Sequence, residues 1–261
     1  MASVTGTVST TLADRVLRIH VDRADKLGAF TPEMFDGLAA ALAELEGTDD
    51  AWVGVVTFQG PHTTAGLDLP RFAASMRDGG GAADDDRPDA FAIRRRCRKP
   101  VVMAVQGICF TIGIEMALAA DIVVAADDTR FAQLEPKRGL AVFGGAHVRY
   151  IQRAGWGNAM YHLLRADEFD AHRALQLGFV QEVVAAGTQI DRALALAAEI
   201  LECAPIAVQE IKRAASVYLE QGERAAFDQI SHMRTTTANT QDFAEGIASF
   251  RERRPAHFKG R

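Results

Sequence analysis

Two glycine-containing turns in the sequence can present backbone N–H groups to a ligand. The first is Gly60-Pro-His-Thr-Thr-Ala-Gly-Leu-Asp-Leu69, directly after a predicted strand that ends at Phe58. The second is Gly107-Ile-Cys-Phe-Thr-Ile-Gly-Ile-Glu115, where a strand turns into a helix. The first amides of a helix lack partners within it and carry the positive end of its dipole. Two such donors aimed at one point form an oxyanion hole for acyl chemistry, although either segment alone also fits an ordinary turn at a strand end.

The most apolar stretch of the chain, residues 100–126, is interrupted by two carboxylates, Glu115 and Asp121. Its length invites a membrane-spanning interpretation, which needs about 20 apolar residues. A charge at the centre of a bilayer, however, costs at least ~2.5 kcal/mol. We therefore predict that this stretch is a buried part of a globular core and that the protein has no membrane partner.

Composition and motifs exclude several other kinds of function. The net charge of −5 argues against a nucleic-acid partner. The seven histidines lack ligand spacing, so we predict no metal site. Cys97, Cys109 and Cys203 are widely spaced and odd in number, which fits a reducing compartment better than a disulfide framework. The first residues lack the basic flank and apolar core of a signal peptide. These features together predict a cytoplasmic protein.

The elements that must position the two turns alternate between strand and helix over residues 10–150. Thr31 and Pro32 are an N-cap and a first-turn proline, and the helix that they start ends at Gly47. Residues 113–120 are a second, short helix. The predicted strands are 15–21, 51–58, 101–106 and 121–126. This alternation predicts an α/β core with at least partly parallel strand pairing.

The pattern changes after residue 150, where helices dominate. A single short strand is predicted at 179–184, and the predicted helices are 157–165, 170–178, 188–203, 205–219, 223–235 and 239–254. The chain is therefore predicted to be an α/β body followed by a largely helical C-terminal part.

Two charged segments remain outside these elements. Residues 77–89 combine glycines with like charges and cannot bury a core, so we expect a solvated insertion, with a lid over a nearby pocket as the alternative. The basic cluster of residues 94–99 is expected to be a solvated or subunit-facing side of a helix rather than a specific anion site.

Several short motifs accompany the two turns in a fixed order along almost the whole chain. They are Arg23-Ala-Asp-Lys-Leu-Gly-Ala-Phe30, Thr64-Ala-Gly-Leu-Asp68, Lys99-Pro-Val-Val-Met-Ala-Val-Gln-Gly107, Phe131-Ala-Gln-Leu-Glu-Pro136, Gly144-Gly145 and Glu245-Gly-x-x-x-Phe250. One such motif is weak, but the ordered series is specific. It resembles the signature of the enoyl-CoA hydratase/isomerase (crotonase) superfamily.

The resemblance implies a fold and a set of reacting groups. The fold is a crotonase-like spiral of ββα units, with a catalytic α/β core over residues 1–195 and a helical C-terminal assembly region over residues 196–261. The second part resembles the trimerisation region of the family, so a homotrimer or a dimer of trimers is implied. Leu67 and Ile112 take the positions whose backbone N–H groups form the oxyanion hole. Glu115 and Glu135 take the positions of the two glutamates that hold the attacking water in hydratases of this family. Both have apolar sequence neighbours, so burial is expected to raise their pKa values.

The activity that the resemblance implies is hydration of a trans-2-enoyl-CoA thioester, as in fatty acid metabolism. Coenzyme A is then part of the substrate, and no separate cofactor is expected. Two alternatives stay open: a double-bond isomerase acting on enoyl- or dienoyl-CoA, and an acyl-CoA-binding homologue with little turnover. The residues implied for coenzyme A binding are Asp25, Lys26, Ala65, Leu67, Asp68 and Arg253.

The sequence departs from the pattern of this family at three places. Residues 111–113 are Thr-Ile-Gly where hydratases of the family usually carry three glycines. Thr63 replaces a common aromatic residue, and Gly28 replaces the usual asparagine. These changes predict a bulkier pocket floor beside the thioester and bear on the choice of acyl chain.

Overall fold

A six-stranded sheet lies at the centre of the computed structural model, which describes residues 5–77 and 85–261. Its strand order is β1-β2-β3-β4-β6-β9. The first pair is antiparallel and the other pairs are parallel. The bounds are β1 Thr7–Ala13, β2 Val16–Asp22, β3 Val53–Phe58, β4 Val101–Val105, β6 Ile122–Ala126 and β9 Glu182–Val184.

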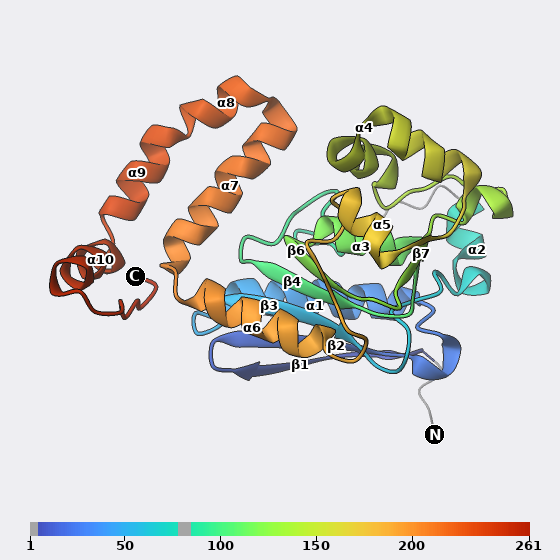
Figure 1. Cartoon of the computed structure of the whole chain (residues 1–261), viewed down its shortest axis with the longest axis horizontal. Coiled ribbons are helices and arrows are strands. Elements are labelled where there is room, and N and C mark those ends of the chain that lie inside the picture. Colours follow the sequence, from blue (N-terminus) through green and yellow to red (C-terminus); the bar gives the residue numbers. More distant parts are fainter. Residues whose placement is uncertain (1–4, 78–84) are drawn as a thin grey trace.

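Helices cover both faces of this sheet (Figure 1). On one face, α1 (Pro32–Gly47) and α3 (Ile112–Ala119) share a core with Leu17, Ile19 and Val56. On the other face, α6 (Gln189–Leu201) packs on Val53 and Val55. Parallel strands that are covered on both sides carry near-continuous apolar runs. The fully buried run of β3 therefore needs no polar alternation.

A second, three-stranded sheet prepares the site. It contains β5 (Ile108–Phe110), β7 (Arg130–Ala132) and β8 (Phe169–Asp170). Strands β5 and β7 are parallel, so the segments that follow them leave the sheet at the same edge. The segment after β5 is the start of α3, and the segment after β7 leads to the short 3-10 helix Glu135–Arg138. Pairing of two short strands thus brings residues 112–115 and residue 135 together.

Helix α4 (Ala146–Arg165) begins well before the predicted residue 157. Its residue Gly155 has the non-helical angles φ 73° and ψ 165°, so the helix is interrupted there. The interruption at Gly155 means that the apolar residues before and after it do not follow one continuous 3.6-residue period. The start predicted for this helix, residue 157, was therefore wrong. The helices that follow are α5 (Ala171–Gln176), α7 (Pro205–Gln221), α8 (Glu223–Asp228), α9 (Ile230–Ala238) and α10 (Gln241–Glu252). The single helix predicted at 223–235 is two helices that meet at Gln229.

The last four helices, α7–α10, form an arm that extends away from the α/β body (Figure 1). Few of their residues are buried. Large apolar side chains are exposed on this arm: Ile211, Tyr218, Leu219, Phe227, Ile230, Phe243, Ile247 and Phe250. Apolar surface of this extent marks a surface that contacts another protein chain or a ligand.

Of the two charged segments, the structure describes the basic cluster in full but only the ends of the segment over residues 77–89. The basic cluster does not form the expected helix side, because residues 92–100 are irregular. Arg95 instead pairs with the buried Glu46, and Arg96 donates to the carbonyl oxygen of Ala119 at 2.5 Å.

Most of the glycine- and aspartate-rich segment, residues 78–84, lies outside the described residues. Among residues 5–77 and 85–261, no helix combines the length and the apolar character that a membrane span requires.

Candidate active site

The turn that carries Leu67 is fixed to strand β5. The Thr64 N–H donates to the Ile108 carbonyl at 2.9 Å, and the Phe110 N–H donates to the Thr64 carbonyl at 3.0 Å. The hydroxyl of Thr63 donates to the Gln106 carbonyl at 3.0 Å. A threonine at position 63 thus adds a hydrogen bond that an aromatic side chain does not offer. The two glycine turns predicted to act together are one hydrogen-bonded unit.

The backbone N–H of Leu67 is directed away from its neighbouring segment. Leu67 forms a parallel bridge with Phe30, in which Phe30 donates to the Gly66 carbonyl and Asp68 donates to the Phe30 carbonyl, each at 2.9 Å. In such a bridge the central residue turns its own N–H to the opposite side. Within the described residues this N–H has no acceptor in the protein. It is therefore available to a ligand.

The N–H of Ile112 is available for a different reason. Ile112 is the first residue of α3, and the first amides of a helix have no acceptor within it. The preceding residue, Thr111, has φ 52° and ψ −113°. A β-branched residue at positive φ is an outlier, and such strain costs on the order of 1–3 kcal/mol. The structure retains this costly backbone at the point where the helix presents its first amide.

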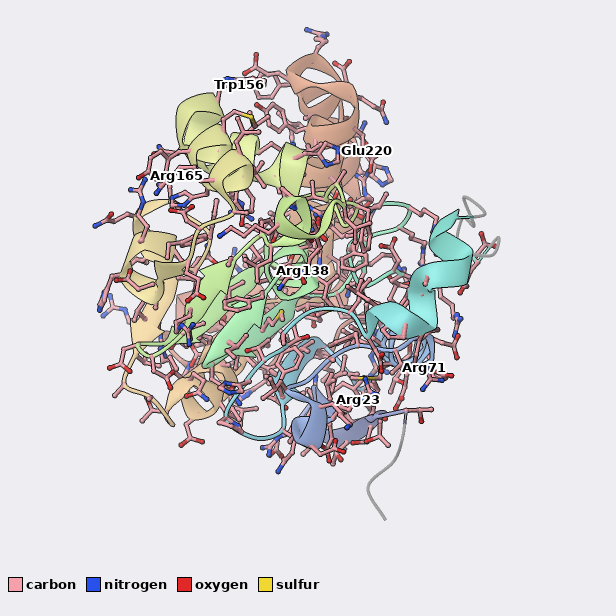
Figure 2. All side chains as sticks on the ribbon, turned by 90° about the vertical axis from the view of Figure 1, so that its right-hand side faces the viewer. Arg23, Arg71, Arg138, Trp156, Arg165 and Glu220 are labelled. Carbon is pink, nitrogen blue, oxygen red and sulfur yellow. The ribbon has the colours of Figure 1, made fainter. Side chains whose placement is uncertain are left out.

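Both amides line one pocket of about 140 Å³. One wall is the pair of turns, with Ala65, Gly66, Leu67, Thr111 and Ile112. The remaining lining residues are Leu69, Leu134, Glu135, Arg138, Leu140 and Phe143. Figure 2 views the molecule from the side on which Arg138 lies near the centre. The pocket lining thus includes both residues with available N–H groups, the carboxyl group of Glu135 and the positive charge of Arg138.

Glu115 lies one helical turn after Ile112 and is completely buried. Its Oε1 accepts the N–H of Gly144 at 2.8 Å and the N–H of Ala146 at 3.1 Å. These donors belong to the first turn of α4 and the residues before it, where helix amides lack internal partners. Among the residues that the structure describes, its Oε2 has no hydrogen-bond partner. One oxygen of Glu115 therefore anchors α4, and the other is unengaged.

Glu135 begins the 3-10 helix after β7 and is only 5% exposed. Within residues 5–77 and 85–261, its Oε1 has one long contact, 3.4 Å from Nε2 of Gln133, and its Oε2 has no hydrogen-bond partner. Its backbone is held by Leu140, whose N–H donates to the Glu135 carbonyl at 3.0 Å. The carboxylate is thus positioned at the pocket wall but is weakly stabilised as an anion.

Burial raises the pKa of both carboxyl groups from 4.5 to about 7. For Glu115, the N–H groups of Ala146 and Gly144 oppose this rise and the negative charge of Glu135 adds to it. A carboxylate whose pKa responds to another carboxylate lies near it. Near neutral pH, one of the two groups can hold a proton while the other is ionised, which is what an acid–base pair requires.

Two further buried polar atoms accompany this pair, and sequence reasoning did not single them out. They are Oε1 of Gln133 and the hydroxyl of Tyr150, and neither has a partner in the described part of the protein. The negative charges of Glu115 and Glu135 reinforce the effect of burial and keep the pKa of Tyr150 well above its usual value. Most buried polar atoms in folded proteins are satisfied. A cluster of unsatisfied ones around two carboxylates identifies the polar centre of a functional site.

Most residues predicted to bind coenzyme A lie together. Asp25 and Lys26 form an exposed 3-10 turn, and the Ala65 N–H donates to the adjacent Leu27 carbonyl at 2.9 Å. Asp68 pairs with the buried Arg23 at 2.8 Å, so it stabilises the turn. Arg253 ends α10 in the C-terminal arm, on the other side of the molecule (Figure 1). Its predicted role requires a second subunit and stays a prediction.

Comparison with known proteins agrees with this fold. The profile of the family "Enoyl-CoA hydratase/isomerase" matches residues 11–261. The chain is 30% identical to 2,3-dehydroadipyl-CoA hydratase of Escherichia coli, over 95% of this chain and 96% of that protein. It is 29% identical to enoyl-CoA hydratase EchA19 of Mycobacterium tuberculosis, over 94% and 93% of the two chains. A crystal structure of a probable enoyl-CoA hydratase/isomerase from Mycobacterium abscessus superimposes with a TM-score of 0.92 at 40% identity, covering 98% and 99%.

These matches define the class of the protein, which has a crotonase-type α/β fold. The chain belongs to the enoyl-CoA hydratase/isomerase family. The predicted family and the predicted fold class are therefore confirmed.

Proposed function

We propose that this protein is an enoyl-CoA hydratase, which adds water across the α,β double bond of a trans-2-enoyl-CoA. The observation that carries the proposal is the pair of buried carboxyl groups, Glu115 and Glu135, beside two unengaged backbone N–H groups. Two of the relatives are named as hydratases of CoA thioesters. The family also includes isomerases, so the reaction is assigned from the site and not from the fold.

The two backbone donors act on the thioester. Its carbonyl oxygen accepts hydrogen bonds from the N–H groups of Leu67 and Ile112. When an oxygen nucleophile adds at Cβ, negative charge develops on this oxygen, and fixed donors stabilise it without having to reorient. Removing one such donor in other enzymes costs about 10²–10³ in kcat. The backbone origin of both donors makes their placement independent of side-chain identity.

The two carboxyl groups divide the proton transfers. Glu115, whose Oε1 accepts two N–H bonds, is better stabilised as an anion and removes a proton from water. Glu135 has only one long contact and donates its proton to Cα. The hydroxide equivalent forms the C–O bond at Cβ, and the π bond breaks. Passage of one proton from Glu115 to Glu135 then restores the starting state.

The coenzyme portion is assigned to the segment around η1 (Ala24–Lys26) and the first turn. Asp25, Lys26 and Ala65 offer polar groups and backbone at an exposed edge next to Leu67. Arg138 in the pocket lining supplies a positive charge suited to a phosphate or a carboxylate. No cofactor beyond the coenzyme A of the substrate takes part in these steps.

We also propose that residues 196–261 mediate assembly into a trimer or a dimer of trimers. The support is the exposed apolar surface of the arm, on which Phe250 is 85% exposed. Association in this way would bury that surface and would bring Arg253 toward the site of a neighbouring chain.

Hydration of short and medium trans-2-enoyl-CoAs in ¹⁸O-labelled water tests the reaction. The expected product is a 3-hydroxyacyl-CoA that carries one ¹⁸O. Glu115→Gln and Glu135→Gln are each expected to lower kcat by about 10²–10⁴-fold while still binding a saturated acyl-CoA. An isomerised product without ¹⁸O would assign an isomerase instead. Binding without turnover over the whole panel would assign a binding protein.

A further inference from the structure

Thr111 has an unusual backbone that its neighbours hold in place. Its φ of 52° lies in the region that favours glycine, and its ψ is −113°. The Thr111 N–H donates to the Ala132 carbonyl at 2.8 Å. Its carbonyl accepts the N–H groups of Ile114 at 3.0 Å and Glu115 at 3.2 Å. Strain of this kind persists where the surroundings determine the conformation, and it concentrates at functional sites.

The side chain of Thr111 extends from the second glycine-containing turn, residues 107–115, toward the first, residues 60–69. A Cβ placed on Gly66 would lie 2.6 Å from Oγ1 of Thr111, and 3.8 Å from its Cβ and Cγ2. The hydroxyl is therefore the part of Thr111 nearest to the first turn. Gly66 directly precedes Leu67, one of the two N–H donors. The hydroxyl thus lies between the segments that supply both donors.

This hydroxyl is not used by the protein itself. Thr111 is partly exposed and lines the pocket together with Leu67 and Ile112. In the described residues its Oγ1 has no hydrogen-bond partner. Thr63 and Thr64, in the neighbouring turn, both use their hydroxyls to hold the backbone. A free, rotatable O–H at this position can turn toward whatever oxygen occupies the pocket.

We propose that the Thr111 hydroxyl donates a third hydrogen bond to the thioester carbonyl oxygen, beside the N–H groups of Leu67 and Ile112. The inference rests on the proposed function in one respect, namely that an acyl thioester occupies this pocket. A glycine, which fits the backbone without strain, supplies no such donor. The hydroxyl gives the strained threonine a chemical role, because the bond strengthens as the oxygen gains negative charge.

Two nearly isosteric variants separate the hydroxyl from the shape of the side chain. Thr111→Ser keeps the O–H, and Thr111→Val keeps the branched shape without it. Hydration kinetics are expected to show kcat within about threefold of the parent for Thr111→Ser. For Thr111→Val, kcat should fall about 10- to 100-fold, the range for a hydrogen bond to a charged group. The dissociation constant of butyryl-CoA should change little in both, because a neutral carbonyl gains less from the donor.

A spectroscopic readout makes the inference independent of turnover. Butyryl-CoA labelled with ¹³C at the carbonyl cannot be hydrated, and its C=O stretch in an infrared difference spectrum reports hydrogen bonding to that oxygen. We expect a downshift on binding that is kept in Thr111→Ser and partly lost in Thr111→Val. Thr111→Gly, which relieves the backbone strain, should match Thr111→Val and serves as the second variant if the valine chain does not fold.

The outcomes separate the two proposals. Equal kcat and equal C=O frequencies for the parent, Thr111→Val and Thr111→Gly would overturn the third donor. A parent protein that hydrates no enoyl-CoA, but shows the downshift and its partial loss in Thr111→Val, would overturn the hydratase and keep the donor. A parent protein that produces no downshift would overturn the placement of the thioester itself, and with it the role of Thr111.

Discussion

Replacing Gly144 with alanine is expected to displace the Glu115 carboxylate without changing any titratable group. A Cβ on Gly144 would lie 2.4 Å from Oε2 of Glu115 and 2.7 Å from its Cδ. Ordinary contact begins at 3.4 Å, so the carboxylate must move by about 1 Å. Gly144 is not among the residues at positive φ, so alanine fits its backbone. A misplacement of about 1 Å can cost about 10²-fold in rate, so we expect kcat to fall about a hundredfold.

The assay is the loss of ultraviolet absorbance as the conjugated double bond of a four-carbon trans-2-enoyl-CoA is hydrated. The matched control is Gly157→Ala, in the helix α4 that follows Gly144 and Gly145, where the added Cβ meets nothing within 4 Å. It should keep the parent kcat and gain up to about 1 kcal/mol of stability, since alanine favours helix. Circular dichroism should show Gly144→Ala folded. A Gly144→Ala protein with the parent kcat would refute the placement of Glu115 in the reaction.

Four other outcomes follow from the site and the arm. The kcat for hydration should fall on both sides of pH 7, because the reaction needs one of the two carboxyl groups ionised and the other protonated. Burial raises the pKa of Glu115 and of Glu135 to about 7. A flat profile of kcat from pH 5 to 9 would contradict this pairing. Between pH 4.5 and about 7 the folded protein binds more protons at these two carboxyl groups than the unfolded chain does. The stability that the protonated carboxyl groups contribute is therefore full below pH 4.5 and is lost as the pH rises through 7. The loss is up to ~3 kcal/mol for each carboxyl group. Glu135→Gln should therefore gain stability over the parent in thermal melts at pH 8 but not at pH 5, and an equal gain at both would count against a raised pKa. Arg23→Ala removes a buried partner of Asp68 and a donor to the Ala29 carbonyl, so chemical denaturation should show that the free energy of unfolding falls by about 2–3 kcal/mol. A fall of less than about 0.5 kcal/mol would show that the pair of Arg23 and Asp68 does not hold the turn. Phe250→Asp places a charge on the exposed apolar arm, and light scattering should show a shift from an oligomer to the 28.2 kDa single chain; an unchanged oligomer mass would place the interface elsewhere.

Residues that act through local sequence could be predicted, because their positions depend on short-range geometry. The two turns follow from a strand that ends at Phe58 and from a helix that starts near Ile112, whereas Leu67 and Ile112 were assigned within these turns from the resemblance to the family. Glu115 lies one turn along the same helix, so its burial followed from the apolar run around it. Whether these groups carry out hydration stays a proposal that the variants above test.

Residues that reach the site through tertiary packing could not be predicted in this way. Tyr150 enters the polar centre only because α4 begins at Ala146, and the break at Gly155 concealed that start. Arg138 joins the pocket because the 3-10 turn folds back after Glu135, and a charged residue in an isolated motif gives no sign of that. The strand β1 and the helix α2 (Leu69–Arg77) were also not foreseen; no residue of β1 is buried, so β1 lacks the alternation of apolar and polar residues that marks a half-buried strand.

Under the proposed function Glu115 has both a structural and a catalytic role, and this affects how relatives of this protein are compared. Its Oε1 holds the start of α4, so selection for folding alone preserves this glutamate even in a lineage that has abandoned the chemistry. Glu135 makes one contact of 3.4 Å and contributes little to the architecture. In such a lineage, Glu135 is free to drift while Glu115 persists. Of the two carboxylates, Glu135 is therefore the better evolutionary marker of retained catalysis.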